Sequence, residues 1–299
     1  MDYKKIFKNR ETRKNILKLL NFVPNSIMLK VQYRLKTGRK LDLKNPKRFT
    51  EKLQWYKVNY RNPILASCVD KYDVREYVSN CGLENILNKC YGVFNSVDEI
   101  DFGSLPERFV AKKTNGSGGL NVLFCKDKST FNFDEAKKIM RNWVKEDEND
   151  TGGREWAYNG LKSRIVIEEY LENSQNPEAG ISDYKFFCFD GKVYGLVVDV
   201  DRYIGHKRNF YDANWNYLDV SSDCPNFGDN LPKPEGFEKL VETAEVLSKG
   251  FPFVRVDLYL VENKIYFGEL TFYPWSGYVQ FTPDSFDFEL GDKFVLPSK

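Results

Sequence analysis

Residues 253–277 read FVRVDLYLVENKIYFGELTFYPWSG and predict a β-hairpin. Two runs rich in valine, tyrosine, phenylalanine, leucine and isoleucine flank a polar break at 262–264, as two strands flank a turn. Side chains alternate between the faces of a strand, so Arg255 and Asp257 share one face. A three-residue turn over the polar break then places Asp257 directly opposite Glu269 on the return strand.

This facing pair of carboxylates predicts a cation site on the hairpin. Facing residues of antiparallel strands lie about 5 Å apart at Cβ, where like charges destabilise the sheet. A divalent cation between Asp257 and Glu269 removes the repulsion, and magnesium commonly uses one or two carboxylates together with substrate phosphates. Arg255 beside the pair suits a phosphoryl or acyl oxygen. The alternative is a solvated face that simply carries charges, and the hairpin alone favours neither.

Composition excludes several classes of protein. The chain has 299 residues, 41% hydrophobic and 15% aromatic, which is typical of a globular protein of one or two domains. It has no apolar run near the ~18 residues of a membrane span, and its charged N-terminus does not resemble a signal peptide, so we expect a cytoplasmic protein. The six cysteines form no CxxC pair, and a single histidine, His206, argues against a histidine triad.

The formal net charge of +2 is unevenly distributed along the chain. Residues 1–50 contain 15 lysines and arginines but 3 acidic residues, whereas the remainder contains 30 lysines and arginines and 40 acidic residues. A basic segment before an acidic body predicts an anionic partner, which is a membrane surface or an anionic glycan. Nucleic acid is not expected because no recognition motif accompanies the charge. A solvated basic face is the alternative.

The chain changes character near residue 69. Apolar residues at helical spacing predict helices within 1–37 and again around 53–56. We therefore place a domain boundary before Val69. This divides the chain into a helical, basic N-terminal region at 1–68 and a second domain at 69–299.

A glycine-rich turn joins two predicted strands in FVAKKTNGSGGLNVLFCKD, residues 109–127. Glycines let backbone N–H groups approach an anion closely, Lys112 leans over the same turn, and Ser117 offers a hydroxyl. The turn leads into a strand and lacks GK[ST], so it is not a Walker A loop. We expect a cover for phosphates, with an ordinary glycine hairpin as the alternative.

Two further strand segments carry charged residues that suggest ligand contacts. The segment RIVIEEYLE, 164–172, runs into Glu168 and Glu169, which suit either the amino group of a purine or a strand that exits to solvent. The hairpin SDYKFFCFDGKVYGLVVDVDRY, 182–203, turns at Asp-Gly and carries Lys185 in its first strand.

In their order along the chain, these motifs resemble the ATP-grasp superfamily, and more narrowly its TupA-like branch, which is associated with teichuronopeptide and other surface-polysaccharide synthesis. The motifs are DKYDVREYV, FVAKKTNGSGG, IVIEEYLE, DYKFF, and FVRVDLY with IYFGELTF. The resemblance extends over nearly the whole chain from about residue 25. It implies an α+β ATP-grasp fold whose two subdomains, about 69–168 and about 169–299, grip ATP behind the helical N-terminal extension.

The resemblance also implies roles for individual residues. It places nucleotide contacts at Lys112, Gly116, Ser117, Gly118, Gly119, Glu168, Glu169 and Leu171. It places Mg²⁺ at Asp257 and Glu269, and Arg255 and Lys185 at the reacting groups. Many ATP-grasp enzymes have Glu-x-Asn at the second metal position, where this chain has Thr271. We do not expect Thr271 to be a ligand, so a second magnesium is expected to be held differently.

The implied activity is that of an ATP-dependent carboxylate–amine ligase. ATP phosphorylates a carboxylate, and an amine then attacks the acyl phosphate to give an amide, ADP and phosphate. The implied acceptor is a uronic acid of a surface polysaccharide of capsule, O-antigen or teichuronic type, or its precursor, and the donor is an amino acid or amine. Arg202, His206 and Arg208 are expected to contact the substrate carboxylate. The basic N-terminal region suits peripheral contact with the inner membrane face.

Three other functions stay open. The main alternative is a glycosyltransferase that uses a nucleotide sugar, because Asp199-Val200-Asp201 matches the DxD metal motif. A kinase that leaves a stable phosphoester is the second. A non-catalytic module that binds anionic polymer through residues 1–50 is the third.

Overall fold

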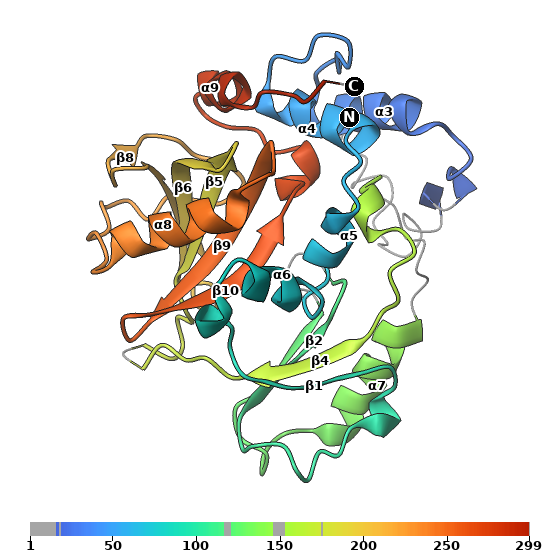
Figure 1. Ribbon diagram of the computed structural model, residues 1–299, viewed down its shortest axis with the longest axis vertical. Coiled ribbons are helices and arrows are strands. Elements are labelled where there is room, and N and C mark those ends of the chain that lie inside the picture. The colour runs from blue at the N-terminus through green and yellow to red at the C-terminus, as the bar shows by residue number, and fades with distance from the viewer. Residues whose placement is uncertain (1–15, 18, 117–120, 146–152, 175, 299) are drawn as a thin grey trace.

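Two antiparallel sheets organise the chain (Figure 1). The computed structural model describes residues 16–17, 19–116, 121–145, 153–174 and 176–298. A four-stranded sheet has the order β1-β4-β2-β3, and a six-stranded sheet has the order β10-β9-β5-β6-β7-β8. The strands are β1 Cys90–Phe94, β2 Phe109–Lys113, β3 Val122–Cys125, β4 Ile165–Glu169, β5 Asp183–Phe189, β6 Lys192–Val200, β7 Lys207–Asp212, β8 Tyr217–Leu218, β9 Phe253–Val261 and β10 Lys264–Thr271.

Helices cover these sheets and connect them. The α-helices are α3 Asn25–Thr37, α4 Phe49–Asn59, α5 Ile64–Cys68, α6 Val74–Asn80, α7 Phe133–Lys145, α8 Phe237–Ser248 and α9 Ser285–Lys293. Short 3₁₀ turns are η1 Glu84–Ile86, η2 Val97–Glu99, η3 Trp156–Tyr158 and η4 Pro274–Gly277. Mixed helices and antiparallel sheets confirm the predicted α+β class. Within the described part of the chain, no helix combines the length and apolar character that crossing a bilayer requires.

The hairpin of β9 and β10 forms as predicted, but its turn differs. Glu262 and Asn263 both have positive φ, 51° and 60°, and make a two-residue turn that pairs Val261 with Lys264. The predicted three-residue turn is therefore wrong. A β-bulge between Phe267 and Glu269 inserts one residue into β10 and restores the pairing of Glu269 with Asp257.

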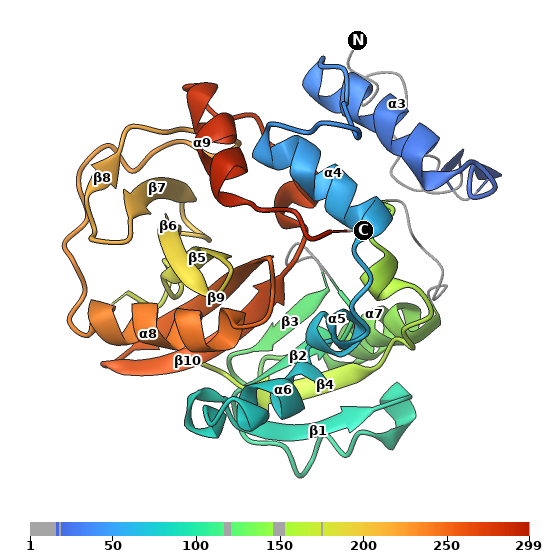
Figure 2. The ribbon, with the colours of Figure 1, turned by 45° about the horizontal axis from the view of Figure 1, so that its top comes forward.

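Helix α8 covers one face of the six-stranded sheet, where it contacts β5, β6 and β9 (Figure 2). From β5, the ring of Phe186 lies 6.3 Å from that of Phe237 of α8, and Cys188 Sγ lies 3.9 Å from the Ala244 carbonyl oxygen. Because side chains alternate along a strand, Lys185 points to the opposite face. That face therefore carries the polar residues of β5 and its neighbours.

The N-terminal helices are attached to the core of the six-stranded sheet. Helix α4 contacts α9 and η4, and the Phe49 ring meets the Phe253 ring edge to face at 5.0 Å. Tyr56 is fully buried in the same cluster. The helix expected in residues 1–15 lies outside the described residues, and the domain boundary at Val69 stays a prediction.

Candidate active site

A row of charged side chains crosses the six-stranded sheet on the face opposite α8. Strand pairing sets Glu269 of β10 beside Asp257 of β9, and Asp257 beside Lys185 of β5. On the next strands, Asp199 of β6 pairs with Arg208 of β7. Lys185 joins the two pairs, because its Nζ lies 3.5 Å from an oxygen of Asp257 and 3.5 Å from an oxygen of Asp199.

Arg255 binds both carboxylates of the hairpin. Its Nε and Nη2 donate to the two oxygens of Asp257 at 2.7 and 2.6 Å. Nη2 also donates to Glu269 Oε1 at 3.4 Å and to Thr271 Oγ1 at 3.1 Å. The hairpin therefore brings together the two predicted metal ligands and the predicted catalytic arginine, and the guanidinium supplies the positive charge beside them.

Burial and neighbouring charges shift the pKa values of Asp257 and Glu269 in opposite directions. Burial raises the pKa of Asp257 to about 6, although Arg255 and Lys185 favour its ionised form. Burial also tends to raise the pKa of Glu269, but Lys71, Arg255 and Lys185 outweigh it and lower that pKa to about 2. The Glu269 side chain is 44% exposed, so solvent screens these cations, and an arriving ligand can reach its oxygens.

The predicted substrate-binding residues each lie against a carboxylate. Arg202 donates to Asp183, which also pairs with Lys185. His206 Nε2 lies 3.1 Å from Asp199 Oδ1. One oxygen of Asp183, Oδ1, is buried and has no hydrogen-bond partner among the described residues. The structure thus gathers these residues beside Lys185 and leaves a buried acceptor among them.

A tryptophan links the two arginines of the site. Arg208 donates to both oxygens of Asp199, at 2.6 and 3.1 Å, and to Asp223. The indole of Trp275 lies 5.3 Å from the Arg208 guanidinium and 5.8 Å from that of Arg255, and its Nε1 donates to Asp223 at 3.0 Å. Cation–π contact of this kind favours a fixed orientation of both guanidinium groups.

Two residues expected at different parts of a nucleotide are in contact. Lys112 of β2 lies 2.6 Å from Glu168 of β4, and Arg75 of α6 lies 3.5 Å from the other oxygen of Glu168. Burial opposes ionisation of Glu168, but Lys112 and Arg75 outweigh it and lower its pKa. The carboxylate is therefore held ionised on the four-stranded sheet.

The remaining predicted nucleotide contacts lie at the ends of β2 and β4. The backbone N–H of Glu169 donates to the Lys89 carbonyl at 2.9 Å, so this strand end is paired. Leu171 follows β4 and is partly buried. Gly116 is partly buried after β2. Ser117, Gly118 and Gly119 lie outside the described residues.

Lys71 is a charged residue of this site that the sequence analysis did not single out. Its backbone N–H donates to the backbone carbonyl of Thr114 at 2.8 Å, and its Nζ donates to the carbonyl of Gly116. Burial lowers the pKa of Lys71, Glu269 opposes that effect, and Lys112 adds to it. Lys71 therefore lies within electrostatic reach of both sheets. It stands in DKYDVREYV, the first of the motifs that carry the family resemblance.

Lys57 of α4 was also missed. It is fully buried, and its Nζ donates to the carbonyls of Gly153 and Ser276 at 2.8 and 2.9 Å and to Ser276 Oγ at 2.8 Å. Glu155 lies 3.4 Å away. Trp275 and Ser276 have left-handed backbones, with φ of 49° and 54°, a conformation that costs free energy in residues other than glycine. Lys57 therefore anchors the strained turn that carries Trp275.

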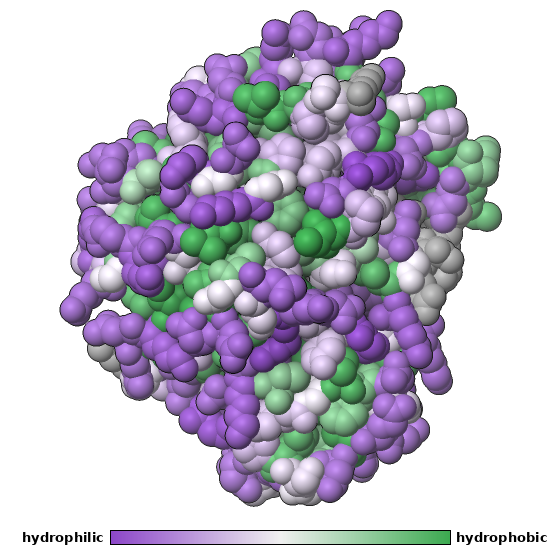
Figure 3. Space-filling view, in the orientation of Figure 1, coloured by the Kyte–Doolittle hydropathy of each residue, from purple (hydrophilic) through white to green (hydrophobic). Residues whose placement is uncertain are grey.

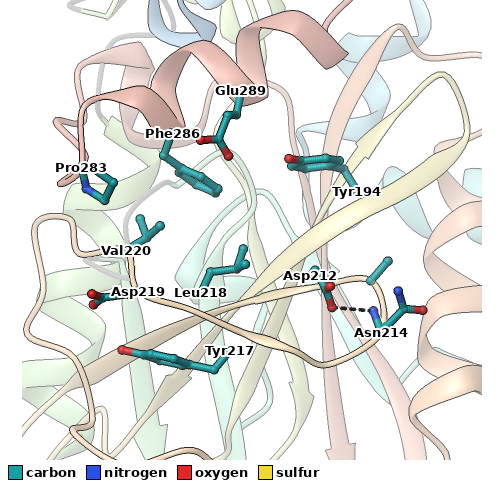
Figure 4. Close-up of a pocket in the computed structure, with 11 residues that line it drawn as sticks. Tyr194, Asp212, Asn214, Tyr217, Leu218, Asp219, Val220, Pro283, Phe286 and Glu289 are labelled. Carbon is teal, nitrogen blue, oxygen red and sulfur yellow. Dashed lines mark hydrogen bonds between the residues drawn. The ribbon is translucent and has the colours of Figure 1, made fainter.

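A separate pocket of about 550 Å³ lies between the β7–β8 hairpin and α9 (Figure 4). Figure 4 shows Phe286 and Glu289 of α9 on one side and Tyr217 and Asp219 on the other. None of the predicted site residues lines this pocket. Its lining residues are Tyr194, Asp212, Ala213, Asn214, Tyr217, Leu218, Asp219, Val220, Pro283, Phe286 and Glu289.

Three solved structures illustrate the similarity of this chain to known proteins. D-alanine–D-alanine ligase from Bacillus anthracis is 18% identical with a TM-score of 0.45, and the match covers 70% of this chain and 58% of that one. N5-carboxyaminoimidazole ribonucleotide synthetase in its ADP complex is 14% identical with a TM-score of 0.44, and the match covers 74% of this chain and 50% of that one. Biotin carboxylase from Campylobacter jejuni is 12% identical with a TM-score of 0.41, covering 77% and 47%. This chain thus spans about half the length of these solved chains.

A family-level match covers most of the sequence. No curated protein matches the chain. The model of a family described as TupA-like ATPgrasp matches residues 51–295. This match confirms the family and the fold predicted from the order of the motifs. The chain therefore belongs to the TupA-like ATP-grasp family.

Proposed function

We propose that this protein is an ATP- and Mg²⁺-dependent ligase that joins a carboxylate to an amine. One observation carries the proposal: the ammonium of Lys71 donates to the carbonyl of Gly116 at the end of β2, and its charge favours the ionised form of Glu269 on β10. Cations and carboxylates from both sheets thus converge where a nucleotide gripped between the sheets needs them. Phosphoryl transfer depends mainly on such positioning and charge stabilisation.

Asp257 and Glu269 fit a magnesium site in their chemistry. Within the described residues, no three or more histidine, cysteine, aspartate or glutamate side chains are grouped to hold a metal. Mg²⁺ needs only one or two carboxylates when substrate phosphates supply further oxygens. We propose these two residues as its ligands, with the ion neutralising charge on the phosphates. Arg255 donates one hydrogen bond to each oxygen of Asp257, and each oxygen keeps a second lone pair with which it would bind the ion.

The guanidinium of Arg255 also has a role in this scheme. It lies beside Asp257 and Lys185, where we propose that both cations stabilise the transferring phosphoryl group and the acyl oxygen. ATP is a substrate: the carboxylate oxygen attacks its γ-phosphorus and ADP leaves. The amine then attacks the acyl carbon and loses a proton, and phosphate leaves. No side-chain nucleophile is required.

The nucleotide contacts are proposed on the four-stranded sheet. Lys112 and Lys71 would bind the phosphates beside Gly116. Glu168, Glu169 and the backbone near Leu171 would hold the adenine. Lys112 and Glu168 lie 2.6 Å apart on the same face of adjacent strands, so the proposed phosphate and adenine contacts share one surface of the sheet.

The acceptor is proposed to be anionic. Arg202, His206 and Arg208 lie near Lys185 and, through Trp275, near Arg255, which supports their contact with a substrate carboxylate. The finer proposal is a uronic acid of a surface polysaccharide or its precursor, joined to an amino acid or amine. It rests on the association of the family with surface-polysaccharide synthesis.

Nucleotide-dependent thermal stability tests this function against the glycosyltransferase alternative. Asp199 and Asp201 would form the DxD motif that a transferase needs. We expect ATP with Mg²⁺ to raise the melting temperature of the wild type and of Asp201→Asn equally, and UDP-sugars to leave it unchanged. Asparagine suits the positive φ of Asp201, 54°. A shift with UDP-sugars alone, lost in Asp201→Asn, would establish the transferase instead.

Replacing Lys71 by methionine is expected to weaken ATP binding about tenfold. Methionine keeps much of the length but removes the charge, and loss of one charge-assisted phosphate contact costs about 1.4 kcal/mol. Titration calorimetry with ATP and Mg²⁺ measures the dissociation constant. Lys126→Met, at an exposed lysine that follows β3, is the matched control and is expected to bind as the wild type does. An unchanged constant in Lys71→Met would remove Lys71 from the phosphate site.

A further inference from the structure

Helix α3 presents an apolar face to solvent. Ile27, Val31 and Leu35 recur every four residues and therefore form one stripe, with exposures of 53%, 48% and 46%. Leu19 and Phe22, in the segment before the helix, are 75% and 83% exposed. We name these five residues the α3 ridge. Figure 3 shows hydrophobic atoms at the upper right edge of the molecule, where Figure 1 places α3 and the segment before it.

The opposite face of α3 is fixed to the body of the protein. Leu29 and Tyr33 are fully buried, and the Tyr33 hydroxyl lies 2.8 Å from Thr50 Oγ1 of α4. Gln32 and Tyr278 are joined by a 2.6 Å hydrogen bond. These contacts therefore fix the orientation of α3, with the stripe of apolar residues facing solvent.

A buried arginine holds the segment before the helix in the same way. Arg154, 5% exposed, donates to the carbonyls of Leu20 and Val23 at 2.7 and 3.1 Å and to the side chain of Asn25 at 3.0 Å. These bonds fix the backbone on both sides of Phe22. The largest side chain of the ridge is thus held outside the core.

The charged residues in the sequence of α3 and of its flanking segments are all positive. Lys30 and Arg34 are exposed on α3, each one residue before a member of the stripe. Residues 12–41 contain no aspartate or glutamate, although they contain eight lysines and arginines. A second copy of this chain would bring a surface of the same sign against it in a two-fold dimer, because such an interface is self-complementary. The charge therefore favours an anionic partner.

We propose that the α3 ridge docks this protein onto a bilayer that contains anionic lipid. The apolar side chains would enter the boundary between headgroups and acyl chains, while Lys30 and Arg34 remain among the lipid phosphates. The helix lies in the plane of the surface, because its other face stays on the protein. This proposal does not depend on the proposed ligase activity.

Co-sedimentation of the full chain with lipid vesicles tests the proposal. We expect the protein to sediment with phosphatidylcholine vesicles that contain phosphatidylglycerol, to bind pure phosphatidylcholine more weakly, and to be partly released by high salt. The double variant Val31→Gln, Leu35→Gln is expected to lower the binding constant at least about tenfold, because two exposed apolar side chains no longer enter the bilayer. Lys30→Glu with Arg34→Glu is expected to abolish the preference for anionic vesicles.

Two controls separate lipid docking from damage to the fold and from self-association. Val295→Gln alters an apolar residue that is 74% exposed in the C-terminal segment, and it is expected to bind vesicles as the wild type does. All variants should keep the wild-type melting temperature within about 2 °C, as surface substitutions usually do. Equal vesicle binding by wild type and ridge variants would overturn the proposal. So would a wild-type dimer that the ridge substitutions convert to monomer without any lipid binding.

Discussion

Replacing Glu269 by glutamine is expected to remove the Mg²⁺-dependent stabilisation of this protein by ATP. A ligand at about 100 times its dissociation constant stabilises the folded state by about 2.7 kcal/mol, which raises the melting temperature of a chain of this length by about 4 °C. Glutamine keeps the shape of the side chain but removes the charge that a magnesium ligand supplies. If binding weakens about a hundredfold, the same concentration stabilises by about 0.4 kcal/mol, and the shift falls below about 1 °C.

The position of Glu269 also predicts a loss of turnover. We expect ADP release to fall by about two to three orders of magnitude in Glu269→Gln, the usual cost of removing a group that stabilises transition-state charge. Glu262→Gln is the matched control, because this exposed glutamate lies in the turn of the same hairpin. Thermal shift and ADP assays on both variants make the comparison. A Glu269→Gln protein that keeps the full Mg²⁺-dependent shift would show that the ion binds elsewhere.

Lys57→Met is expected to lower the free energy of unfolding by about 3–5 kcal/mol, the usual cost of removing one partner from a buried ionic contact. Lys57 is fully buried, and its three short hydrogen bonds satisfy two carbonyls and the hydroxyl of Ser276. Methionine fills similar space but removes all three hydrogen bonds and the charge that faces Glu155, and the Ser276 carbonyl keeps only its bond from Gln54 among the described contacts. The left-handed turn at Trp275 loses its anchor at the same time. For this chain length, the melting temperature should fall by about 5–8 °C.

Thermal and urea unfolding of Lys57→Met measure this loss. The control is Lys239→Met on α8, where the lysine is 65% exposed and pairs with Glu242 one turn away. Its effect should stay below about 0.5 kcal/mol, because exposed ion pairs on helices contribute little. Equal stability of Lys57→Met and Lys239→Met would mean that solvent replaces the buried contacts of Lys57.

Local sequence pattern predicted the elements that carry the site and one of its contacts. Alternation along residues 253–277 placed Asp257 opposite Glu269, and the observed pairing agrees. The predicted turn was nevertheless wrong. Alternation shows which residues face each other, but it does not show whether an extra residue lies in the turn or within the strand. The structure has that residue at Gly268, in the bulge.

Contacts between distant segments were beyond such patterns. Lys112 and Glu168 are 56 residues apart and were assigned to different parts of the nucleotide, because nothing in either segment reveals that β2 pairs with β4. Likewise, Lys57 looks like an ordinary polar residue of an amphipathic helix. Only the packing of α4 on η4 shows that its ammonium is enclosed.

Because of the bulge at Gly268, the length of the turn alone does not decide which residues of β9 and β10 face each other. A Cβ atom at this position would lie 2.8 Å from the carbonyl oxygen of Asp257, so the extra residue has to be glycine or its neighbour must move. If a related chain had one more residue in the turn after Val261 but lacked Gly268, the same glutamate would still pair with Asp257. Among diverged members of the family, insertion at the tip and deletion of the bulge are therefore expected to occur together, as compensating changes in length that leave the two carboxylates paired.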